Sequence, residues 1–248
     1  MTMFLQVQQQ WATPLITVIG LIVVGSEGLF LAPAKHALTD VAVDSNPISY
    51  FGCGCFWHVQ HEFITNFESR LLGRAGLNFT AFAGYAGGTE VGEDGLVCYH
   101  NGKGIADYGE MGHAEVVSLA VDPSNFKAAA EFFFDNVCPG GLRADPQDVG
   151  TEYRSLVGFS GGLESAAGKA FAEVAKQKNV KVVAGKGDDA DVSGTVYVMD
   201  TTAFPFYQAE IYHQFHDDML ETYSAKYHSL QSFFVDAGVL QETGCPEQ

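Results

Sequence analysis

The stretch FGCGCFW at residues 51–57 decides the fold, because a strand, a glycine turn and a helix meet within it. The residues before it are typical of a short strand, and residues 56–70 carry apolar side chains at helical spacing. Cys55 is therefore expected at a helix N-terminus, where unpaired N–H groups and the helix dipole lower the pKa of a thiol. Phe56 and Trp57 add an apolar wall beside the sulfur. This stretch predicts a nucleophilic cysteine with a pocket for a methyl-sized group.

Strand and helix patterns continue along the chain in an irregular order. This order favours an α+β fold, a single domain in which helices pack on a sheet. Further helices are predicted at residues 124–136 and Leu163–Gln177, with a helical tail beginning in Ala209–Leu220 and a loop at residues 84–88. Strands are predicted at Ile48–Phe51, Leu77–Ala83, Ala114–Val121, Tyr153–Phe159, Val180–Ala184 and Thr195–Val198.

The composition limits the partners and the cysteine chemistry. A net charge of −17 over 248 residues argues against nucleic acid, whose phosphates need Lys and Arg. Five cysteines leave at least one unpaired in a monomer, and the chain has no Cys-x-x-Cys motif. We therefore expect one special thiol with optional partners, rather than a structural disulfide framework.

The first 34 residues differ in character from the rest. Residues 14–25 are nearly all apolar, a length that suits the core of a signal peptide better than a membrane span. Small residues suit cleavage after Ala34, although no Lys or Arg precedes the apolar run. We expect a leader over residues 1–34, which delivers the chain to the secretory pathway or an organelle, and a linker over 35–47. The alternative is a membrane anchor formed by residues 14–31.

Four further segments follow FGCGCFW along the chain. They are FAGYAGG at 82–88, GHAEVV at 112–117, DVGTEYRS at 148–155 and AEIYHQ at 209–214. In this order the set resembles the A-type peptide methionine sulfoxide reductases, which reduce methionine-(S)-sulfoxide. Five motifs in matching order are hard to obtain by chance. The resemblance implies a monomer with a two-layer α+β sandwich as its single catalytic domain over residues 48–217, followed by a C-terminal extension over 218–248.

The resemblance assigns catalytic roles to Cys55, Glu115, Asp148 and Tyr153. Cys55 attacks the sulfoxide sulfur, and the two aromatic residues after it hold the S-methyl group. Glu115 is the acid, because its strand neighbours have buried character and desolvation raises the pKa of a carboxyl group. Tyr153 donates a hydrogen bond to the sulfoxide oxygen, and Asp148 orients groups or water near the thiol.

The chain departs from the family pattern in two places. The family has a second oxygen-binding tyrosine ahead of the middle-loop cysteine, where this chain reads EDGL at residues 93–96. Tyr108, in the longer loop that follows, is the candidate to replace it in substrate binding, and Tyr99 is its competitor. Gln60 stands where the family has a glutamate. These departures motivate an alternative function, a relative that senses oxidants or binds oxidised methionine through Cys55.

After its attack Cys55 is a sulfenic acid, which a second thiol must resolve. Family members place resolving cysteines near the C-terminus, so Cys245 is the first candidate and Cys98 the second. Cys53 is too close to Cys55 for easy pairing, and Cys138 has no expected use. The resemblance implies oxidised proteins or free methionine sulfoxide as substrates. It implies no bound cofactor, but an external thiol reductant such as thioredoxin or dithiothreitol.

Two pairs of histidines lie three residues apart, His58 with His61 and His213 with His216. Such pairs suggest a third alternative, a secreted metal-binding protein. Neither pair has Cys or Asp at a supporting spacing. We therefore expect exposed helix histidines and no metal.

Overall fold

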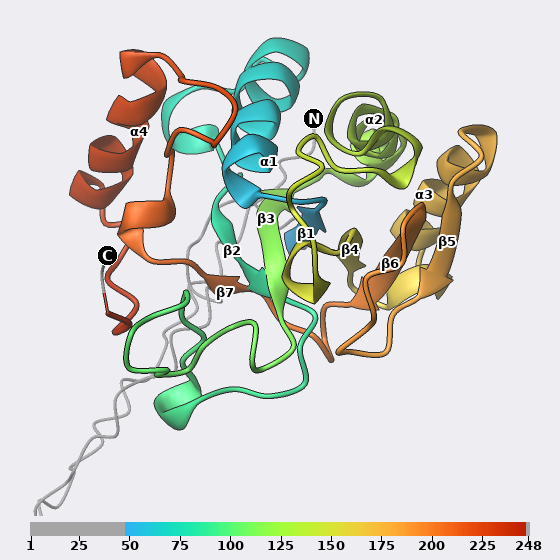
Figure 1. Cartoon of the computed structure of the whole chain (residues 1–248). Coiled ribbons are helices and arrows are strands. Elements are labelled where there is room, and N and C mark those ends of the chain that lie inside the picture. Colours follow the sequence, from blue (N-terminus) through green and yellow to red (C-terminus); the bar gives the residue numbers. More distant parts are fainter. Residues whose placement is uncertain (1–47, 247–248) are drawn as a thin grey trace, which may run out of the picture. The chain divides into compact units, whose positions relative to one another are not determined.

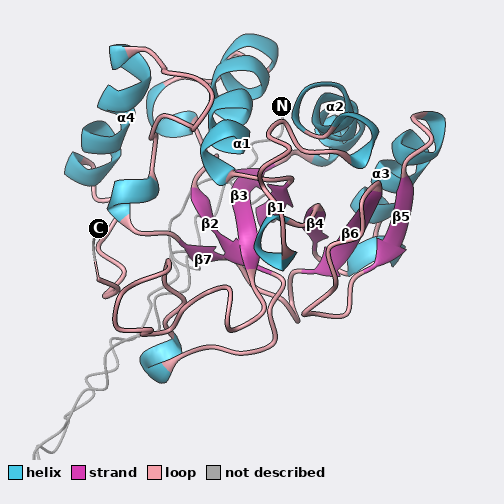
Figure 2. Ribbon diagram, viewed as in Figure 1, coloured by secondary structure: helices cyan, strands magenta, loops and turns pink. Residues whose placement is uncertain are grey.

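The computed structural model describes residues 48–246, which form a mixed seven-stranded sheet with helices packed against it (Figures 1 and 2). The strands are β1 (Ile48–Gly52), β2 (Ala83–Ala86), β3 (Ala114–Ala120), β4 (Leu156–Phe159), β5 (Lys181–Ala184), β6 (Thr195–Asp200) and β7 (Tyr207–Gln208). Their order is β5-β6-β4-β1-β3-β2-β7. The β6 strand pairs in parallel with β4 and β5, and the other pairs are antiparallel. The predicted α+β class is confirmed.

The helices follow the apolar periodicity of the sequence. They are α1 (Phe56–Glu62), α2 (Phe126–Phe132), α3 (Ala166–Gln177) and α4 (Ala225–Asp236). The α1 helix continues as a wider π-helical segment over Phe63–Leu71, and α2 does so over Phe133–Val137. Ser165 and Ser224 begin α3 and α4 as N-caps, because each hydroxyl accepts a hydrogen bond from an amide of the first turn.

The buried side chains form two clusters, one on each face of the sheet. Successive side chains of a strand point to opposite faces. In β1, Phe51 joins the larger cluster, which contains buried apolar side chains of α1, α2 and α3, whereas Tyr50 joins the smaller one. In β3, Val117 belongs to the larger cluster and Val116 to the smaller one. The helices therefore cover one face of the sheet as a second layer.

The central position of β1 brings distant segments of the chain together. Its register pairs Phe51 with Val117 of β3 and Gly52 with Leu156 of β4. A Cβ atom on Gly52 would lie 2.4 Å from the Glu115 carbonyl oxygen, so this close approach requires glycine. The turn after β1 therefore lies between the strand that carries Glu115 and the segment that leads into β4.

Three predicted elements differ in the structure. Of the strand predicted at Leu77–Ala83, only Ala83 belongs to a strand, and Gly76–Asn78 form a 3₁₀ turn instead. The Gly-Tyr-Ala segment predicted as a loop belongs to β2, because Gly84 allows β7 to approach closely: a Cβ there would lie 2.2 Å from the Tyr207 carbonyl oxygen. The predicted helical tail in Ala209–Leu220 is wrong. Phe215 has a φ of 56°, which a right-handed helix does not allow, and the C-terminal helix is α4, further along the chain.

The predicted leader (1–34) and linker (35–47), with the alternative anchor at 14–31, lie outside the described residues. Among residues 48–246, no helix has the length and apolar content needed to cross a membrane.

Candidate active site

Cys55 begins α1 at the point where the turn leaves β1. Gly54 adopts a φ of 81° in this turn, and its amide donates to the Tyr153 carbonyl oxygen at 3.1 Å. The Cys55 amide donates to Asp148 Oδ2 at 2.9 Å, and the next amide in the helix donates to Glu115 Oε2 at 2.8 Å. The free N–H groups of the helix thus bind two carboxyl groups. These contacts bring the four predicted catalytic residues together at one helix N-terminus.

The pKa of the Cys55 thiol is higher than the sequence predicts. Burial raises this pKa well above its usual range, and the neighbouring Glu115 charge raises it further. The backbone N–H groups of Trp57 and His58 lower it, as expected at a helix N-terminus, but burial outweighs them. The expectation of a lowered thiol pKa is therefore wrong. Protonation of Glu115 removes one cause of the rise, so the two groups titrate in a linked way.

Glu115 is an acid poised near neutral pH. Its side chain is 1% exposed, and burial raises its pKa from 4.5 to about 8. Hydrogen bonds from the Phe56 amide and the Tyr108 hydroxyl lower this pKa, and the Tyr108 oxygen lies 3.2 Å from Oε1. The charge of Asp148 raises the pKa further. Glu115 therefore holds its proton over most of the physiological range, as the sequence predicts for this strand position.

Asp148 and a segment from the C-terminal extension line the pocket beside the thiol. Burial raises the pKa of the half-buried Asp148 carboxyl, although its bond from the Cys55 amide opposes this. Sequence reasoning missed the contribution of the extension. The pocket is lined by Cys53, Cys55, His58, Ala144, Asp145, Asp148, Asp218, Met219 and Leu220.

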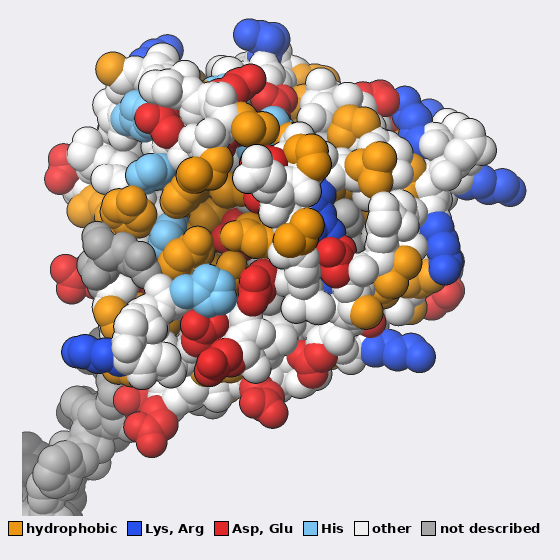
Figure 3. All heavy atoms as spheres, viewed as in Figure 1, with side chains coloured by type: hydrophobic (Ala, Val, Ile, Leu, Met, Phe, Trp, Pro, Cys, Tyr) orange, Lys and Arg blue, Asp and Glu red, His pale blue; other side chains and the backbone are white. Residues whose placement is uncertain are grey.

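The outer surface has a mixed character. Figure 3 shows a face on which apolar side chains gather in the middle with acidic side chains beside them, whereas Lys and Arg lie mainly at its edge. Exposed apolar residues occur in the segments that form the pocket, among them Leu142, Val149 and Met219.

A cluster of tyrosines extends from the thiol to Glu115. Burial raises the pKa of the Tyr99 and Tyr153 phenols, and the charges of Glu115 and Cys55 raise both further. Tyr108, the candidate for substrate binding, is fully buried and donates to Glu115. Its ring stacks on Tyr99 at 5.6 Å between centroids. The Tyr108 hydroxyl thus faces Glu115, whereas Tyr99, the competitor, is the partly exposed tyrosine of this pair.

Phe56 and Trp57 stand in an aromatic wall with Tyr99 and His213. Phe56 is fully buried, and Trp57 stacks on His216 with 4.4 Å between ring centroids. His213 is 1% exposed, and burial lowers its pKa from 6.5 to about 4. The expectation of an exposed helix histidine is wrong for His213, because the segment folds inward after β7.

Gln60 has a structural explanation in this chain. Its buried amide donates to the Ala81 carbonyl oxygen and to Gln214 Oε1, and its own Oε1 accepts from the Phe215 amide at 2.7 Å. A neutral amide supplies both the donor and the acceptor that these buried partners need. The glutamine therefore joins α1 to the segment that follows β7.

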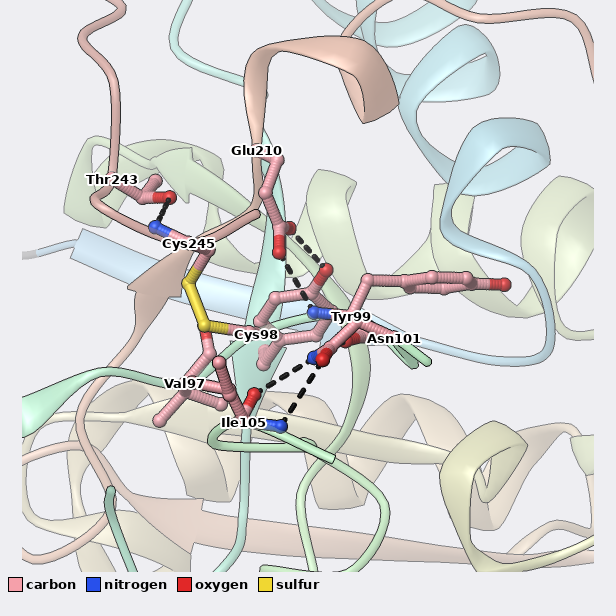
Figure 4. Close-up of a disulfide and its surroundings, with 9 residues drawn as sticks. Val97, Cys98, Tyr99, Asn101, Ile105, Glu210, Thr243 and Cys245 are labelled. Carbon is pink, nitrogen blue, oxygen red and sulfur yellow. Dashed lines mark hydrogen bonds between the residues drawn. A yellow bond between two sulfur atoms is a disulfide. The ribbon is translucent and has the colours of Figure 1, made fainter. Parts of the chain in front are cut away.

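The two cysteines predicted as alternative resolving residues form a disulfide with each other, Cys98 with Cys245 (Figure 4). The Glu210 carboxylate lies beside this bond, where it accepts from the Tyr99 amide at 2.8 Å and the Tyr85 hydroxyl at 2.7 Å. Figure 4 shows the Tyr99 side chain pointing away from the disulfide. Tyr99, the residue after Cys98, thus connects the segment that carries the disulfide with the tyrosine cluster near the Cys55 thiol.

Cys53 and Cys138 form a second disulfide, and both residues are buried. Of the five cysteines, all within the described residues, Cys55 is the free one. Cys138, which had no expected use, is therefore the partner of Cys53, and the special thiol of Cys55 stays unpaired. Spacing along the chain gives no sign of either bond, since 85 and 147 residues separate the partners.

The chain is similar to known proteins over most of its described length. Residues 48–238 match the family described as peptide methionine sulfoxide reductase. The chain belongs to this family. The enzyme named peptide methionine sulfoxide reductase MsrA from Salmonella schwarzengrund is 30% identical over 183 residues, which cover 73% of this chain and 74% of the relative. The match to the peptide methionine sulfoxide reductase family runs past residue 217 and through α4.

Two solved structures are also similar to the chain. Reduced Mxr1 from Saccharomyces cerevisiae is 22% identical, with a TM-score of 0.45 over 73% of this chain and 90% of that chain. Methionine sulfoxide reductase A of Corynebacterium diphtheriae is 20% identical, with a TM-score of 0.41 over 68% of this chain and 72% of that chain.

Proposed function

We propose that the protein reduces methionine-(S)-sulfoxide, free or within proteins, to methionine. The observation that carries the proposal is the free Cys55 thiol at a helix N-terminus whose first amides bind Asp148 and a protonated Glu115. In the first step the cysteine sulfur attacks the sulfoxide sulfur. The oxygen passes to the cysteine as a sulfenic acid, and the substrate leaves as a thioether.

Glu115 moves the proton in this step. It donates its proton to the sulfoxide oxygen as the S–O bond weakens, which leaves a carboxylate in a buried site. The thiol then supplies a proton to that carboxylate, so that sulfoxide and thiol become thioether and sulfenic acid with no net proton exchange. A carboxyl group with a pKa of about 8 suits this relay, because it is protonated at neutral pH and still a competent donor.

Tyr99 and Tyr153 hold the sulfoxide oxygen in this proposal. Both phenols lie near Glu115 and Cys55, whose charges act on them, and a polarised sulfoxide oxygen can accept a hydrogen bond from each. Tyr108 acts only through Glu115, whose Oε1 accepts its hydrogen bond. Tyr99, which follows Cys98, thus takes the place of the family tyrosine that is missing ahead of this cysteine.

The Cys98–Cys245 disulfide is the end of the oxidative half-cycle. One of these thiols attacks the sulfenic acid and releases water, and the other then displaces Cys55 to form the bond seen in the structure. Cys245 is partly exposed near the C-terminus, where an external dithiol such as thioredoxin can reach it, whereas Cys98 is buried.

The test uses residues 35–248 with dithiothreitol and each epimer of dabsyl-methionine sulfoxide. We expect turnover of the (S) epimer only and none by Cys55→Ser. A sulfenic acid on Cys55 without turnover of either epimer would favour the alternative, an oxidant sensor or a protein that binds oxidised methionine.

We also propose that the protein works as a monomer in the secretory pathway or an organelle, where disulfides persist. The apolar segment within residues 1–34 and the buried Cys53–Cys138 disulfide, which lies outside the catalytic cycle, support this location. Edman sequencing of the mature protein from its native cells tests it: a start at Lys35 is expected. An N-terminus that retains residues 14–31 would instead favour the membrane anchor.

A further inference from the structure

A methionine of this chain lines the pocket of its own reactive cysteine. Met219 is 79% exposed and lies in the segment between Gln214 and α4, which lines the same pocket as Cys55. The other two methionines of the described residues differ: Met199 is fully buried, and Met111 is intermediate and lies outside the pocket. Among residues 48–246, the methionine that oxidants in solvent reach most easily is thus the one that lines the pocket of the thiol.

The segment that carries Met219 is fixed at this place by its aspartates. Asp218 Oδ1 accepts from the Leu220 amide at 2.7 Å, and Oδ2 accepts from the Tyr223 hydroxyl at 2.7 Å. The same Oδ2 lies 3.6 Å from Nδ1 of His58, a residue of the first turn of α1. These bonds hold the segment against the helix that Cys55 begins. The Met219 side chain itself is largely exposed, so the segment and not the side chain is what these bonds hold.

We propose that Met219 is an intramolecular substrate, whose (S)-sulfoxide is reduced by Cys55 of the same chain. The inference rests on the proposed function and extends it to one site in the protein itself. The oxygen of the Met219 sulfoxide passes to the Cys55 sulfur, which leaves the thioether and a sulfenic acid. Cys98 and Cys245 then resolve the sulfenic acid to a disulfide with release of water, and an external dithiol reduces that disulfide.

Tethering gives this reaction a kinetic signature. A sulfoxide carried on the pocket rim has a high effective concentration at the thiol, so its repair follows first-order kinetics that dilution does not change. An oxidised Met219 also occupies the place of an external sulfoxide. External substrate is then reduced only after a lag, and Met219→Leu removes the lag while it keeps an apolar side chain of similar volume.

The experiment first protects the thiols of the full chain as mixed disulfides with methanethiol, and then oxidises the methionines with hydrogen peroxide. Dithiothreitol exposes Cys55 and starts the reaction, and mass spectrometry follows the oxygen on the Met219 peptide. We expect about half of the sulfoxide to disappear, because peroxide makes both epimers and one enzyme type reduces only one. The half-time stays unchanged over a roughly hundredfold dilution. In the Cys55→Ser variant all of the Met219 sulfoxide should remain. Met111 sulfoxide is the internal control: this methionine lies outside the pocket, so its repair by a second molecule should slow on dilution.

Two results would overturn the proposal. One is a Met219 sulfoxide that persists in a sample that reduces dabsyl-methionine-(S)-sulfoxide. The other is a repair rate that falls in proportion to dilution, as expected for reduction by a second molecule. A sample that reduces neither Met219 nor the dabsyl substrate instead refutes the proposed function, so the two failures are distinguishable.

Discussion

Replacement of Glu115 by glutamine tests whether this buried carboxyl holds the proton that the reaction needs. A pKa raised from 4.5 to about 8 means that the folded protein binds a proton there which the unfolded chain has lost at neutral pH. Such a group stabilises the fold most below pH 4.5, and the contribution is lost as the pH rises toward 8. With about 1.4 kcal/mol for each pKa unit, the loss between pH 4.5 and pH 7 is about 3 kcal/mol.

Glutamine does not titrate, and its side-chain oxygen can still accept the hydrogen bond from the Phe56 amide. The free energy of unfolding of Glu115→Gln, minus that of the parent protein, should therefore grow by about 3 kcal/mol from pH 4.5 to pH 7. Urea unfolding at a series of pH values, with the disulfides intact, measures this difference. We expect the same variant to lose about 10²- to 10⁴-fold in kcat, because it has no proton to donate.

Glu152→Gln is the matched control, because this nearby carboxylate is 32% exposed and binds neither the thiol nor its amides. It should change the pH dependence of stability only slightly and keep the activity. If the difference in the free energy of unfolding between Glu115→Gln and the parent protein did not change from pH 4.5 to pH 7, the reasoning would be refuted. Glu115 would then have the pKa of an ordinary carboxyl group in the folded protein. Full activity of that variant would remove Glu115 as the acid.

The remaining predictions concern the tyrosines, the pH profile and the second disulfide. Tyr99→Phe should lower kcat/KM about 10- to 100-fold, the effect of one lost hydrogen bond to a developing charge, and unchanged kinetics would return the role to Tyr108. In the parent protein kcat should fall as the pH rises through about 8, because Glu115 loses its proton. Tyr108→Phe should move this fall to higher pH, since its hydroxyl lowers the pKa of Glu115; a fall that does not move would contradict the contact. A chain whose Cys55, Cys98 and Cys245 are reduced, with the Cys53–Cys138 bond intact, should convert about two methionine sulfoxides per chain when no reductant is added. The Cys98→Ser and Cys245→Ser variants should each convert about one per chain. A yield of two from either variant would show that another thiol resolves the sulfenic acid.

The sequence determined those features that depend on neighbouring residues. The apolar spacing after Cys55 fixed α1, and the apolar run around Glu115 fixed β3 and the burial that raises its pKa. The order of the five motifs indicated the family, which the match over residues 48–238 confirmed. Each of these inferences uses local periodicity or a short motif, which a chain carries whatever its tertiary contacts.

The tertiary structure alone decided how distant groups meet. It directed the Tyr108 hydroxyl to Glu115 and stacked Tyr99 on Tyr108, while the Glu210 carboxylate binds the Tyr99 amide and fixes the loop. It joined Cys98 to Cys245 across 147 residues, and it raised the pKa of a thiol that the helix N-terminus by itself would lower. Desolvation and pairing across the fold depend on which segments pack together, and a linear pattern does not contain that information.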